Sequence, residues 1–369
     1  LLVQNFIDMK KSKSLLIFIP SIESGGVEKN LYLVANYLAK KNISIKILTS
    51  FNNSRKFFDK RIKIISLKNK GGLISSRFLK TLITIFLFFK YSCFSNNLIL
   101  SFQSNITAIL LGLIFNKKII IRSNTSPDKY IKNSLNRIVF QFFFNFADEI
   151  IVNSYEFKKK FNNFFSITPK VIYNPFIRKK YNKIKFAFFN DKKSLKIINV
   201  ARLTDQKDHL TLLMAVKKLS KFIKCKLVII GRGYKEKKLR KYILENNLQK
   251  IVKLIGYKKN PELYIKISDV FVLTSIYEGL PNVLIESLYL KKYIISSDCP
   301  TGPKEILNDG QYGGLFKVGD YNQLFKLLKN FSNKPKKIKY KINQGYKSLA
   351  RFDHENNCRK YFQIISRYL

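Results

Sequence analysis

Short apolar runs alternate with amphipathic helical patterns along the whole chain, and this alternation constrains the fold more than any single motif. The apolar run at residues 15–20 is followed by a glycine turn and by residues 27–40, where Leu31, Val34 and Leu38 recur at helical spacing. A helix between two strands returns the chain to the edge where the first strand began, so the strands lie parallel. The pattern therefore predicts an α/β fold with parallel sheets covered by helices on both faces. The other strands predicted in the first half cover residues 43–48, 62–65, 98–101, 118–121 and 149–152.

The alternation breaks once, in the segment VIYNPFIRKKYNKIKFAFFNDKKS at residues 171–194. Asn174 and Pro175 form a turn signal, and a charged stretch follows them, so we place an inter-domain linker here. A chain of 369 residues also exceeds one ordinary core. We predict a first domain at residues 1–175 and a second at 176–350. The second domain is predicted to contain strands at 196–201, 226–230, 252–255, 270–274 and 293–297, with helices at 209–222, 235–245 and 281–290.

The chain is strongly basic, with 69 Lys and Arg against 23 Asp and Glu and a formal net charge of +46. Residues 1–175 hold 27 basic and 8 acidic residues and the remainder holds 42 and 15, so the excess is spread over both halves. Positive surfaces attract the phosphates of nucleic acids, anionic lipids and nucleotides. A compositional bias, visible in the abundance of Lys, Asn, Ile and Phe, would produce the same charge without a function. The sequence leaves both explanations open.

Residue types that support metal, redox or serine-hydrolase chemistry are sparse. The four cysteines lie far apart without a CxxC spacing, which indicates free thiols in a reducing compartment. The only two histidines are His209 and His354, which argues against His-based metal sites and against a Ser-His-Asp triad in the first domain.

Two segments bear on membranes and targeting. Residues 1–26 are not typical of a secretion signal, because the apolar run at 15–20 is too short and ends in a glycine turn. The segment RFLKTLITIFLFFKYSCF, residues 77–94, has an uninterrupted apolar core of about ten residues, whereas a membrane span needs about 20. It therefore predicts a helix that is either buried or lies on a membrane surface.

Doubly wound sheets bind ligands beyond the carboxyl ends of their strands, and polar residues gather at these positions. Gly25 and Gly26 follow the strand at 15–20, where they let backbone approach a ligand and where a helix N-terminus favours an anion. A structural turn explains these glycines equally well. Arg202 and Lys207 lie at and beyond the end of the strand at 196–201, where two cations can clamp a diphosphate.

The stretch YEGLPNVLIES, residues 277–287, places Glu278 in the loop after the strand at 270–274 and Glu286 inside the next helix. Pro281 suits the first helical turn, because its missing N–H would have no partner there. A carboxylate accepts two hydrogen bonds at once, so Glu286 suits the vicinal diol of a ribose while Glu278 reaches another part of the same ligand. Glutamates near helix N-termini are also common for electrostatic reasons alone.

Together these motifs resemble the retaining GT-B glycosyltransferases of glycosyltransferase family 4, also called glycosyl transferases group 1. The resemblance runs from about residue 14 to about residue 320. It rests on SGGVE, IVNS, VIYNP, VARLTDQKD, LVIIGRG, DVFVLTSIYEGLPNVLIES and SSDCPTGPKEIL. It implies two doubly wound Rossmann-like domains facing across a cleft, the first on the acceptor side and the second binding a nucleotide sugar. It also implies that a C-terminal helix, residues 351–369, returns to the first domain.

The resemblance implies a role for each motif residue. The donor would be a nucleotide-diphosphate sugar, a UDP-sugar by family habit, with Arg202 and Lys207 on the diphosphate. Glu286 would hold the ribose hydroxyls and Glu278 the transferred sugar, so that Glu278, Arg202 and Lys207 form the catalytic group. Backbone at Gly279, Leu280 and Asn282 would line the donor, and Gly25 and Gly26 would close over its phosphates. No metal and no cofactor are expected, and the anomeric configuration is expected to be retained.

The chain also departs from the family. Many relatives carry a first-domain histidine near the donor sugar, and this chain has none there. The loop IIRSNTSP supplies Arg122, Ser123 and Asn124 as candidates for acceptor contact. The family often has small residues and glycine where this chain has SLYLKKY, residues 287–293.

The implied function is hexosyl or N-acetylhexosaminyl transfer to a lipid-linked or envelope saccharide in bacterial glycan biosynthesis. The expected location is cytoplasmic, peripheral on the inner face of the plasma membrane, because a basic surface binds anionic lipid. One alternative is a basic nucleic-acid- or membrane-binding protein without transferase activity, although no specific nucleic-acid signature is present. Another is an inactive family member, against which the retained Arg202, Lys207, Glu278 and Glu286 argue.

Overall fold

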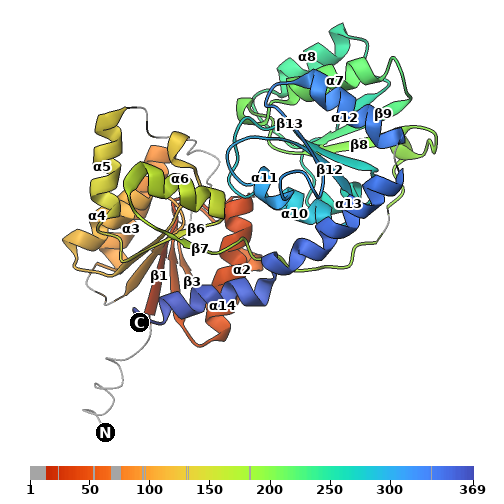
Figure 1. Cartoon of the computed structure of the whole chain (residues 1–369). Helices are drawn as coiled ribbons and strands as arrows, with labels where there is room; N and C mark the ends of the chain where they lie inside the picture. Colours follow the sequence, from red (N-terminus) through yellow and green to blue (C-terminus); the bar gives the residue numbers. More distant parts are fainter. Residues whose placement is uncertain are drawn as a thin grey trace, which may run out of the picture. The chain divides into compact units, whose positions relative to one another are not determined.

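The computed structural model describes residues 14–369 except 24, 53–54, 68–75, 94, 96, 130, 132, 183 and 334. The segment at residues 1–13, which is part of our prediction about a secretion signal, therefore lies outside the described residues. The chain divides into two compact units, each built around a parallel sheet (Figure 1). The first unit contains Leu1–Pro175 together with Phe352–Leu369, and the second contains Phe176–Arg351.

The sheet of the first unit has seven parallel strands in the order β3-β2-β1-β4-β5-β6-β7. The order reverses between β1 and β4, which are hydrogen-bonded neighbours, so the loops after these two strands flank the switch point. The strands are β1 (Ser14–Phe18), β2 (Ser44–Leu48), β3 (Lys63–Ile65), β4 (Leu98–Ser101), β5 (Ile119–Arg122), β6 (Glu149–Val152) and β7 (Lys170–Val171).

Successive side chains of a strand point to opposite sides of the sheet. Because consecutive residues of β1 are apolar, both faces of the sheet are apolar. Leu15 and Ile17 pack in one core, whereas Leu16 and Phe18 pack in another. The helices of the first core are α2 (Gly26–Lys40) and α14 (His354–Ile365). The helices over the opposite face are α3 (Arg77–Tyr91), α4 (Asn105–Ile114), α5 (Ser134–Phe144) and α6 (Tyr155–Phe165). Ser76, Asn133 and Ser154 cap α3, α5 and α6 by accepting a backbone N–H of the first turn.

The C-terminal helix α14 completes the first core although it is far from that core in sequence. It lies beside α2, as the contacts of these two helices show (Figure 1). Cys358, Tyr361 and Ile365 are fully buried among residues of β1 and α2. The chain therefore enters the second unit after Pro175 and comes back to finish the first.

The sheet of the second unit has six parallel strands in the order β10-β9-β8-β11-β12-β13. Its switch point lies between β8 and β11, which pair directly. The strands are β8 (Leu195–Val200), β9 (Cys225–Ile230), β10 (Val252–Leu254), β11 (Val270–Leu273), β12 (Tyr293–Ser297) and β13 (Gly314–Phe316). The helices are α7 (His209–Leu219), α8 (Glu236–Glu245), α9 (Glu262–Ile267), α10 (Asn282–Tyr289), α11 (Pro303–Ile306), α12 (Tyr321–Asn333) and α13 (Pro335–Lys347).

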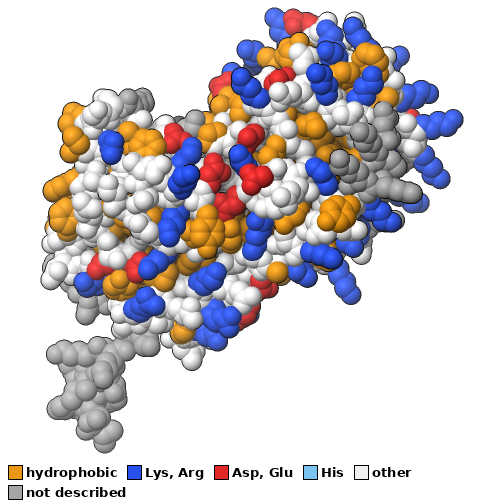
Figure 2. Space-filling view, viewed as in Figure 1, with side chains coloured by type: hydrophobic (Ala, Val, Ile, Leu, Met, Phe, Trp, Pro, Cys, Tyr) orange, Lys and Arg blue, Asp and Glu red, His pale blue; other side chains and the backbone are white. Residues whose placement is uncertain are grey.

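Short 3-10 turns complete the chain, namely η1 (Arg55–Phe57), η2 (Pro127–Lys129), η3 (Ala187–Phe189), η4 (Asp205–Lys207) and η5 (Ser348–Phe352). None of the described helices is both long and apolar enough to cross a bilayer. Lysine and arginine side chains are distributed over the visible face of both units (Figure 2).

The predicted strands and helices are present with boundary shifts of a few residues. In the second unit, the helices α9, α11, α12 and α13 were not predicted. The strands β7 and β13 were not predicted either, because each is only two or three residues long, too short to produce an alternating pattern. The helix expected from Pro281 begins at Asn282, because Pro281 keeps an extended ψ of 109° and serves as the N-cap.

Candidate functional site

The carboxyl ends of β8 and β11 bring two predicted site residues together. Lys207 lies in the 3-10 turn η4 after β8, and Glu278 lies in the loop between β11 and α10. Because β8 and β11 are neighbours at the switch point, these two loops emerge side by side. The topology thus explains why residues 71 positions apart in sequence can form one site.

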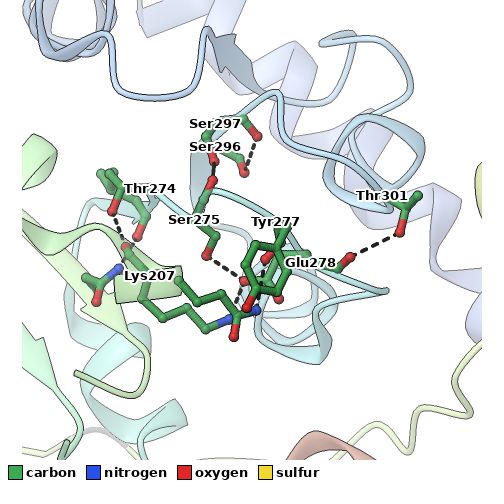
Figure 3. Close-up of polar contacts among 11 residues, drawn as sticks. Lys207, Thr274, Ser275, Tyr277, Glu278, Ser296, Ser297 and Thr301 are labelled. Atoms are coloured by element: carbon green, nitrogen blue, oxygen red, sulfur yellow. Dashed lines mark hydrogen bonds and ion pairs between the residues drawn. The ribbon is translucent and has the colours of Figure 1, made fainter. Parts of the chain in front are cut away.

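Lys207 and Glu278 form an ion pair, and their side chains point toward one another in Figure 3. Their side chains are only 12% and 8% exposed. Ser275 donates a hydrogen bond from its Oγ to the same carboxylate oxygen at 2.5 Å. Charges removed from water require such partners, since an isolated buried carboxylate would be strongly disfavoured. The site therefore holds one fixed positive and one fixed negative charge within the fold.

Hydrogen bonds to main-chain atoms hold the two loops at a fixed distance. Thr274 donates from Oγ1 to the Lys207 carbonyl at 2.9 Å, and Gln206 donates from Nε2 to the Tyr277 carbonyl at 2.9 Å. The Ile276 amide donates in return to the Gln206 carbonyl at 2.8 Å. These contacts fix the backbone on either side of the ion pair, so its geometry does not depend on the side chains alone.

The loop after β12 supports Glu278 from a third direction (Figure 3). The Glu278 amide donates to the Pro300 carbonyl at 2.8 Å, and Thr301 donates from Oγ1 to the Glu278 carbonyl at 3.1 Å. Ser297 donates from Oγ to the Ser275 carbonyl at 2.6 Å. Residues from three neighbouring strand ends thus hold Glu278, through its carboxylate or through the main chain of its loop.

Gly302 packs directly on the backbone that follows Glu278. Its φ is +91°, and a Cβ added there would lie 1.9 Å from the Gly279 carbonyl oxygen and 3.1 Å from the Leu280 Cα. No other residue fits this position without moving the Glu278 loop. The sequence motif contained Thr301 and Gly302, yet nothing in their spacing indicated that they support Glu278. The same holds for Ser275 and Gln206, whose contacts appear only in three dimensions.

Arg202 and Glu286 lie around this centre in different environments. Arg202 follows β8 and is exposed, and among the described residues its guanidinium has no hydrogen-bond or ion-pair partner. Glu286 is buried in the second turn of α10, four residues after Asn282 at the start of the helix. The structure therefore presents an exposed cation and a buried carboxylate at the same sheet edge.

Burial shifts the pKa of two further groups at this edge. His209, the first residue of α7, has a pKa lowered to about 4, first because it is buried and second because of the Lys207 charge. Cys299 has a pKa raised to about 12, again chiefly by burial and then by the Glu278 charge. The imidazole and the thiol are therefore neutral near pH 7. Within the described residues, no three His, Cys, Asp or Glu side chains converge as a metal site would require.

In the first unit, Gly25 is the N-cap of α2 and Gly26 is its first residue, and both are exposed. A Cβ on Gly25 would lie 2.5 Å from an oxygen of the buried Glu28, so a side chain there would have to displace that carboxylate. The helix N-terminus and the two glycines lie together after β1, beside the switch point of the first sheet.

Arg122 lies at the end of β5, but its side chain is fully buried. It donates to Tyr361 Oη at 2.7 Å and to Asn174 Oδ1 at 2.6 Å, and it also contacts Asn124. These partners leave Arg122 no exposed surface for an acceptor, and they give it a structural role instead. Ser123 is buried as well, and Asn124, which is partly exposed, donates to the Phe102 carbonyl at 2.7 Å.

Comparison with known proteins shows what the second unit is similar to. Residues 180–348 match the family model described as Glycosyl transferases group 1. An uncharacterized glycosyltransferase of Methanocaldococcus jannaschii is 37% identical over 228 residues, which cover 55% of this chain and 55% of that protein. A second relative is the N-acetylgalactosamine-N,N'-diacetylbacillosaminyl-diphospho-undecaprenol 4-alpha-N-acetylgalactosaminyltransferase of Campylobacter jejuni. It is 29% identical over 350 residues, which cover 91% of this chain and 93% of the relative.

The fold is shared with solved structures at low sequence identity. The crystal structure of Anabaena HepE in complex with UDP and glucose superposes with a TM-score of 0.77 at 16% identity, covering 96% of this chain and 100% of that one. The predicted fold class is confirmed: the chain has two parallel-sheet α/β units and the GT-B fold.

Proposed function

We propose that this protein is a glycosyltransferase that moves a sugar from a nucleotide-diphosphate sugar to a lipid-linked or envelope saccharide. The observation that carries the proposal is the buried Lys207–Glu278 pair at the switch point, within the segment that matches the group 1 family. The Campylobacter relative, whose name describes a diphospho-undecaprenol-linked acceptor, supports the acceptor class. No observation in the structure or the comparisons favours the alternative of a nucleic-acid-binding protein without transferase activity.

The donor would lie at the carboxyl edge of the second sheet. Arg202 supplies an exposed cation for the diphosphate, and Lys207 supplies a second cation that Glu278 already holds in place. Glu286 accepts hydrogen bonds from the ribose hydroxyls, and Glu278 accepts them from hydroxyls of the transferred sugar. Backbone at Gly279, Leu280 and Asn282 lines the donor. The close packing of the Gly279 carbonyl on Gly302 supports this role, because it fixes the position of that loop. The nucleoside of the donor is uridine in our proposal, as in the UDP bound to Anabaena HepE.

The chemical step is loss of the nucleoside diphosphate from the anomeric carbon as the acceptor hydroxyl attacks. Arg202 and Lys207 stabilise the charge that develops on the leaving diphosphate, and they do so best if they are already in position. We propose that the reaction is independent of metal and retains the anomeric configuration, with the departing phosphate assisting removal of the acceptor proton. In the first unit, Gly25 and Gly26 would close over the donor phosphates. Ser123 is too buried for us to assign it to the acceptor, whereas Asn124 stays a candidate for that contact.

The acceptor class bears on location. A saccharide linked to a lipid carrier stays at a membrane, so we propose that the enzyme works on the inner face of the plasma membrane and attaches to it peripherally. The net charge of +46 supports this, since basic residues near an anionic surface each contribute up to about 1 kcal/mol.

The test is a thermal-shift screen of UDP-, GDP- and ADP-sugars, followed by product analysis with the stabilising donor. We expect one donor class to raise the melting temperature and to be consumed in the presence of EDTA. NMR of the product should show the anomeric configuration of the donor. A chain stabilised by no nucleotide sugar would contradict the proposed function, and an inverted product would contradict the proposed stereochemistry alone.

A further inference from the structure

Helix α3 buries some of its apolar side chains and exposes others. Phe78, Leu82, Phe86 and Phe89 follow one another at intervals of four, four and three residues, which places them on one side of the helix. All four are exposed, Phe78 to 70% and Phe86 to 58%. The opposite side carries Leu87 and Phe88, which are buried in the core of the first unit.

Two neighbouring helices continue this arrangement. On α5, Leu135, Ile138 and Phe142 are exposed at intervals of three and four residues, Phe142 to 57%. On α4, Leu113 and Ile114 are exposed at the C-terminal end. We call these side chains together the apolar face. It consists of Phe78, Leu79, Leu82, Phe86, Phe89, Leu110, Leu113, Ile114, Leu135, Ile138, Val139 and Phe142.

The apolar face is one surface because the three helices cover the same side of the sheet. Helices α4 and α5 contact one another directly. Helix α3 meets the end of α4 through Phe88 and Phe89, whose rings lie 5.4 and 5.5 Å from that of Phe115. Figure 2 shows hydrophobic side chains gathered along the left edge of the molecule, over α4 and α5. Exposed apolar surface of this extent marks an interaction site in a native protein.

The charges on these helices identify the kind of partner. Helices α3, α4 and α5 contain no aspartate or glutamate at any position. Their exposed charged residues are Arg77, Lys90 and Arg137, all positive. Phenylalanine and leucine flanked by basic residues are suited to a surface whose polar groups are anionic and whose interior is hydrocarbon.

We propose that the apolar face of α3, α4 and α5 docks onto an anionic lipid bilayer, with its phenylalanines inserted below the headgroups. The biological purpose of this docking rests on the proposed function. The evidence for the docking itself is the exposure and charge of the three helices. None of the three helices is long enough to cross a bilayer, so each would lie in the plane of the interface.

The docked face borders the functional edge of the first unit. Lys80 of α3 forms an ion pair with Glu23 at 2.6 Å, and Glu23 lies two residues before Gly25. Thr81 of the same helix lies 3.3 Å from the Ser104 hydroxyl, in the loop after β4. Docking through α3 therefore places the bilayer beside the carboxyl edge of the sheet. A lipid-linked acceptor would reach this edge without leaving the membrane.

A tryptophan reporter tests the docking without disturbing it. The chain contains no tryptophan, so Phe86→Trp would introduce a single fluorophore into the apolar face of the full chain. We expect a blue shift, and quenching by brominated lipid, on vesicles of equal parts phosphatidylcholine and phosphatidylglycerol. Leu244→Trp is the control, because Leu244 is 58% exposed on α8 of the second unit. Emission that is unchanged for Phe86→Trp, or that shifts equally in both variants, would overturn the proposal.

A loss-of-binding experiment complements the reporter. The double variant Phe86→Ser/Phe142→Ser should float with anionic vesicles at least about tenfold less than the wild type. Leu244→Ser, with the same exposure, should float like the wild type. Equal flotation of all three proteins would overturn the proposal. A second result would also overturn it: the wild type does not float and sediments as a dimer, whereas the double variant sediments as a monomer. The apolar face would then bind a second copy of the chain.

Thermal shift with UDP separates this inference from the proposed function. The double variant should respond to UDP like the wild type, because neither residue belongs to the nucleotide site. A protein that floats but ignores every nucleotide sugar would refute the proposed function alone. A protein that binds UDP but never floats would refute the docking alone.

Discussion

At the scale of single residues, Glu278 has partners in three loops. Lys207 supplies the opposite charge, Ser275 donates to the same oxygen, and Thr301 holds the backbone. The two charged members were predicted from their residue types and positions at strand ends. Ser275 and Thr301 were not, because a hydroxyl in a loop has no pattern that reveals which carboxylate it contacts.

Removing one charge of this pair should cost more than removing both. Glu278→Gln leaves the Lys207 ammonium buried without a counter-charge, so we expect the free energy of unfolding to fall by about 3 kcal/mol. Lys207→Met/Glu278→Gln should recover most of this loss. Urea denaturation measures both. Asp59→Asn, which breaks the solvent-screened pair with Arg61, serves as a control and should cost much less than Glu278→Gln. Additive losses in the double variant would contradict the coupling.

Glu286→Gln and Arg202→Ala test the donor contacts. Each removes one charged partner of the ligand, so we expect UDP-sugar or UDP affinity to fall by about 1.5–3 kcal/mol, roughly ten- to a hundredfold. Isothermal titration measures the change, and unfolding curves check that the fold is retained. Arg240→Ala, on the exposed face of α8, is the matched control and should leave affinity unchanged. Unchanged affinity in both test variants would remove these residues from the site.

His209 should make stability depend on pH. Its pKa is about 4 in the folded chain and 6.5 in a model peptide, so the unfolded state binds more protons between these values. The free energy of unfolding should therefore fall as pH drops from 6.5 to 4, by up to about 3 kcal/mol. Urea denaturation at a series of pH values measures this fall. His209→Gln should flatten the profile over this range. Parallel profiles for His209→Gln and the wild type would refute the assignment.

At the scale of helices and strands, periodicity predicted most elements but not the environment of every face. In α3 apolar residues occur on more than one side of the helix, so the pattern predicted a helix and left open whether it was buried. The structure shows that it is both, with Leu87 inside and Phe86 outside. The contact of α14 with α2 depends on packing between distant segments, and only the family resemblance pointed to it before the structure was known.

The contribution of the Tyr361 hydroxyl to the packing of α14 can be tested by removing it. Tyr361→Phe removes the acceptor of the Arg122 Nε–H, and both side chains are fully buried. An unsatisfied buried guanidinium N–H should lower the free energy of unfolding by about 1.5–3 kcal/mol. Tyr340→Phe, on the exposed surface of α13, should change it by less than about 0.5 kcal/mol. Chemical denaturation of both variants and the wild type measures these changes. A Tyr361→Phe variant as stable as the wild type would show that the hydrogen bond between Arg122 and Tyr361 contributes nothing to stability.

At the scale of the whole molecule, alternating elements and ordered motifs together predicted the GT-B fold. The charge of +46 was predicted to be spread over the chain, and Figure 2 shows it distributed over both units. Composition gave no indication of the apolar face, because total hydrophobicity does not reveal which side chains remain exposed.

A charge this large should make stability depend on salt. Like charges repel one another over a screening length of about 30 Å at 0.01 M salt, which falls to about 10 Å at 0.1 M. We therefore expect sodium chloride to raise the melting temperature by several degrees across this range. Sodium sulfate at equal ionic strength is the control in a thermal melt. Stabilisation by sulfate alone would indicate anion binding at a site, and not the relief of general repulsion.

The first unit is discontinuous in sequence, because its last helix comes after the whole of the second unit. A ribosome delivers the chain from its N-terminus, so Phe176–Arg351 is complete and able to fold while the first sheet still lacks α14. Until α14 emerges, the surface that later receives Tyr361 and Ile365 stays open to water and to chaperones. Termination of synthesis before α14 would thus release a chain with a finished second unit and an unfinished first one.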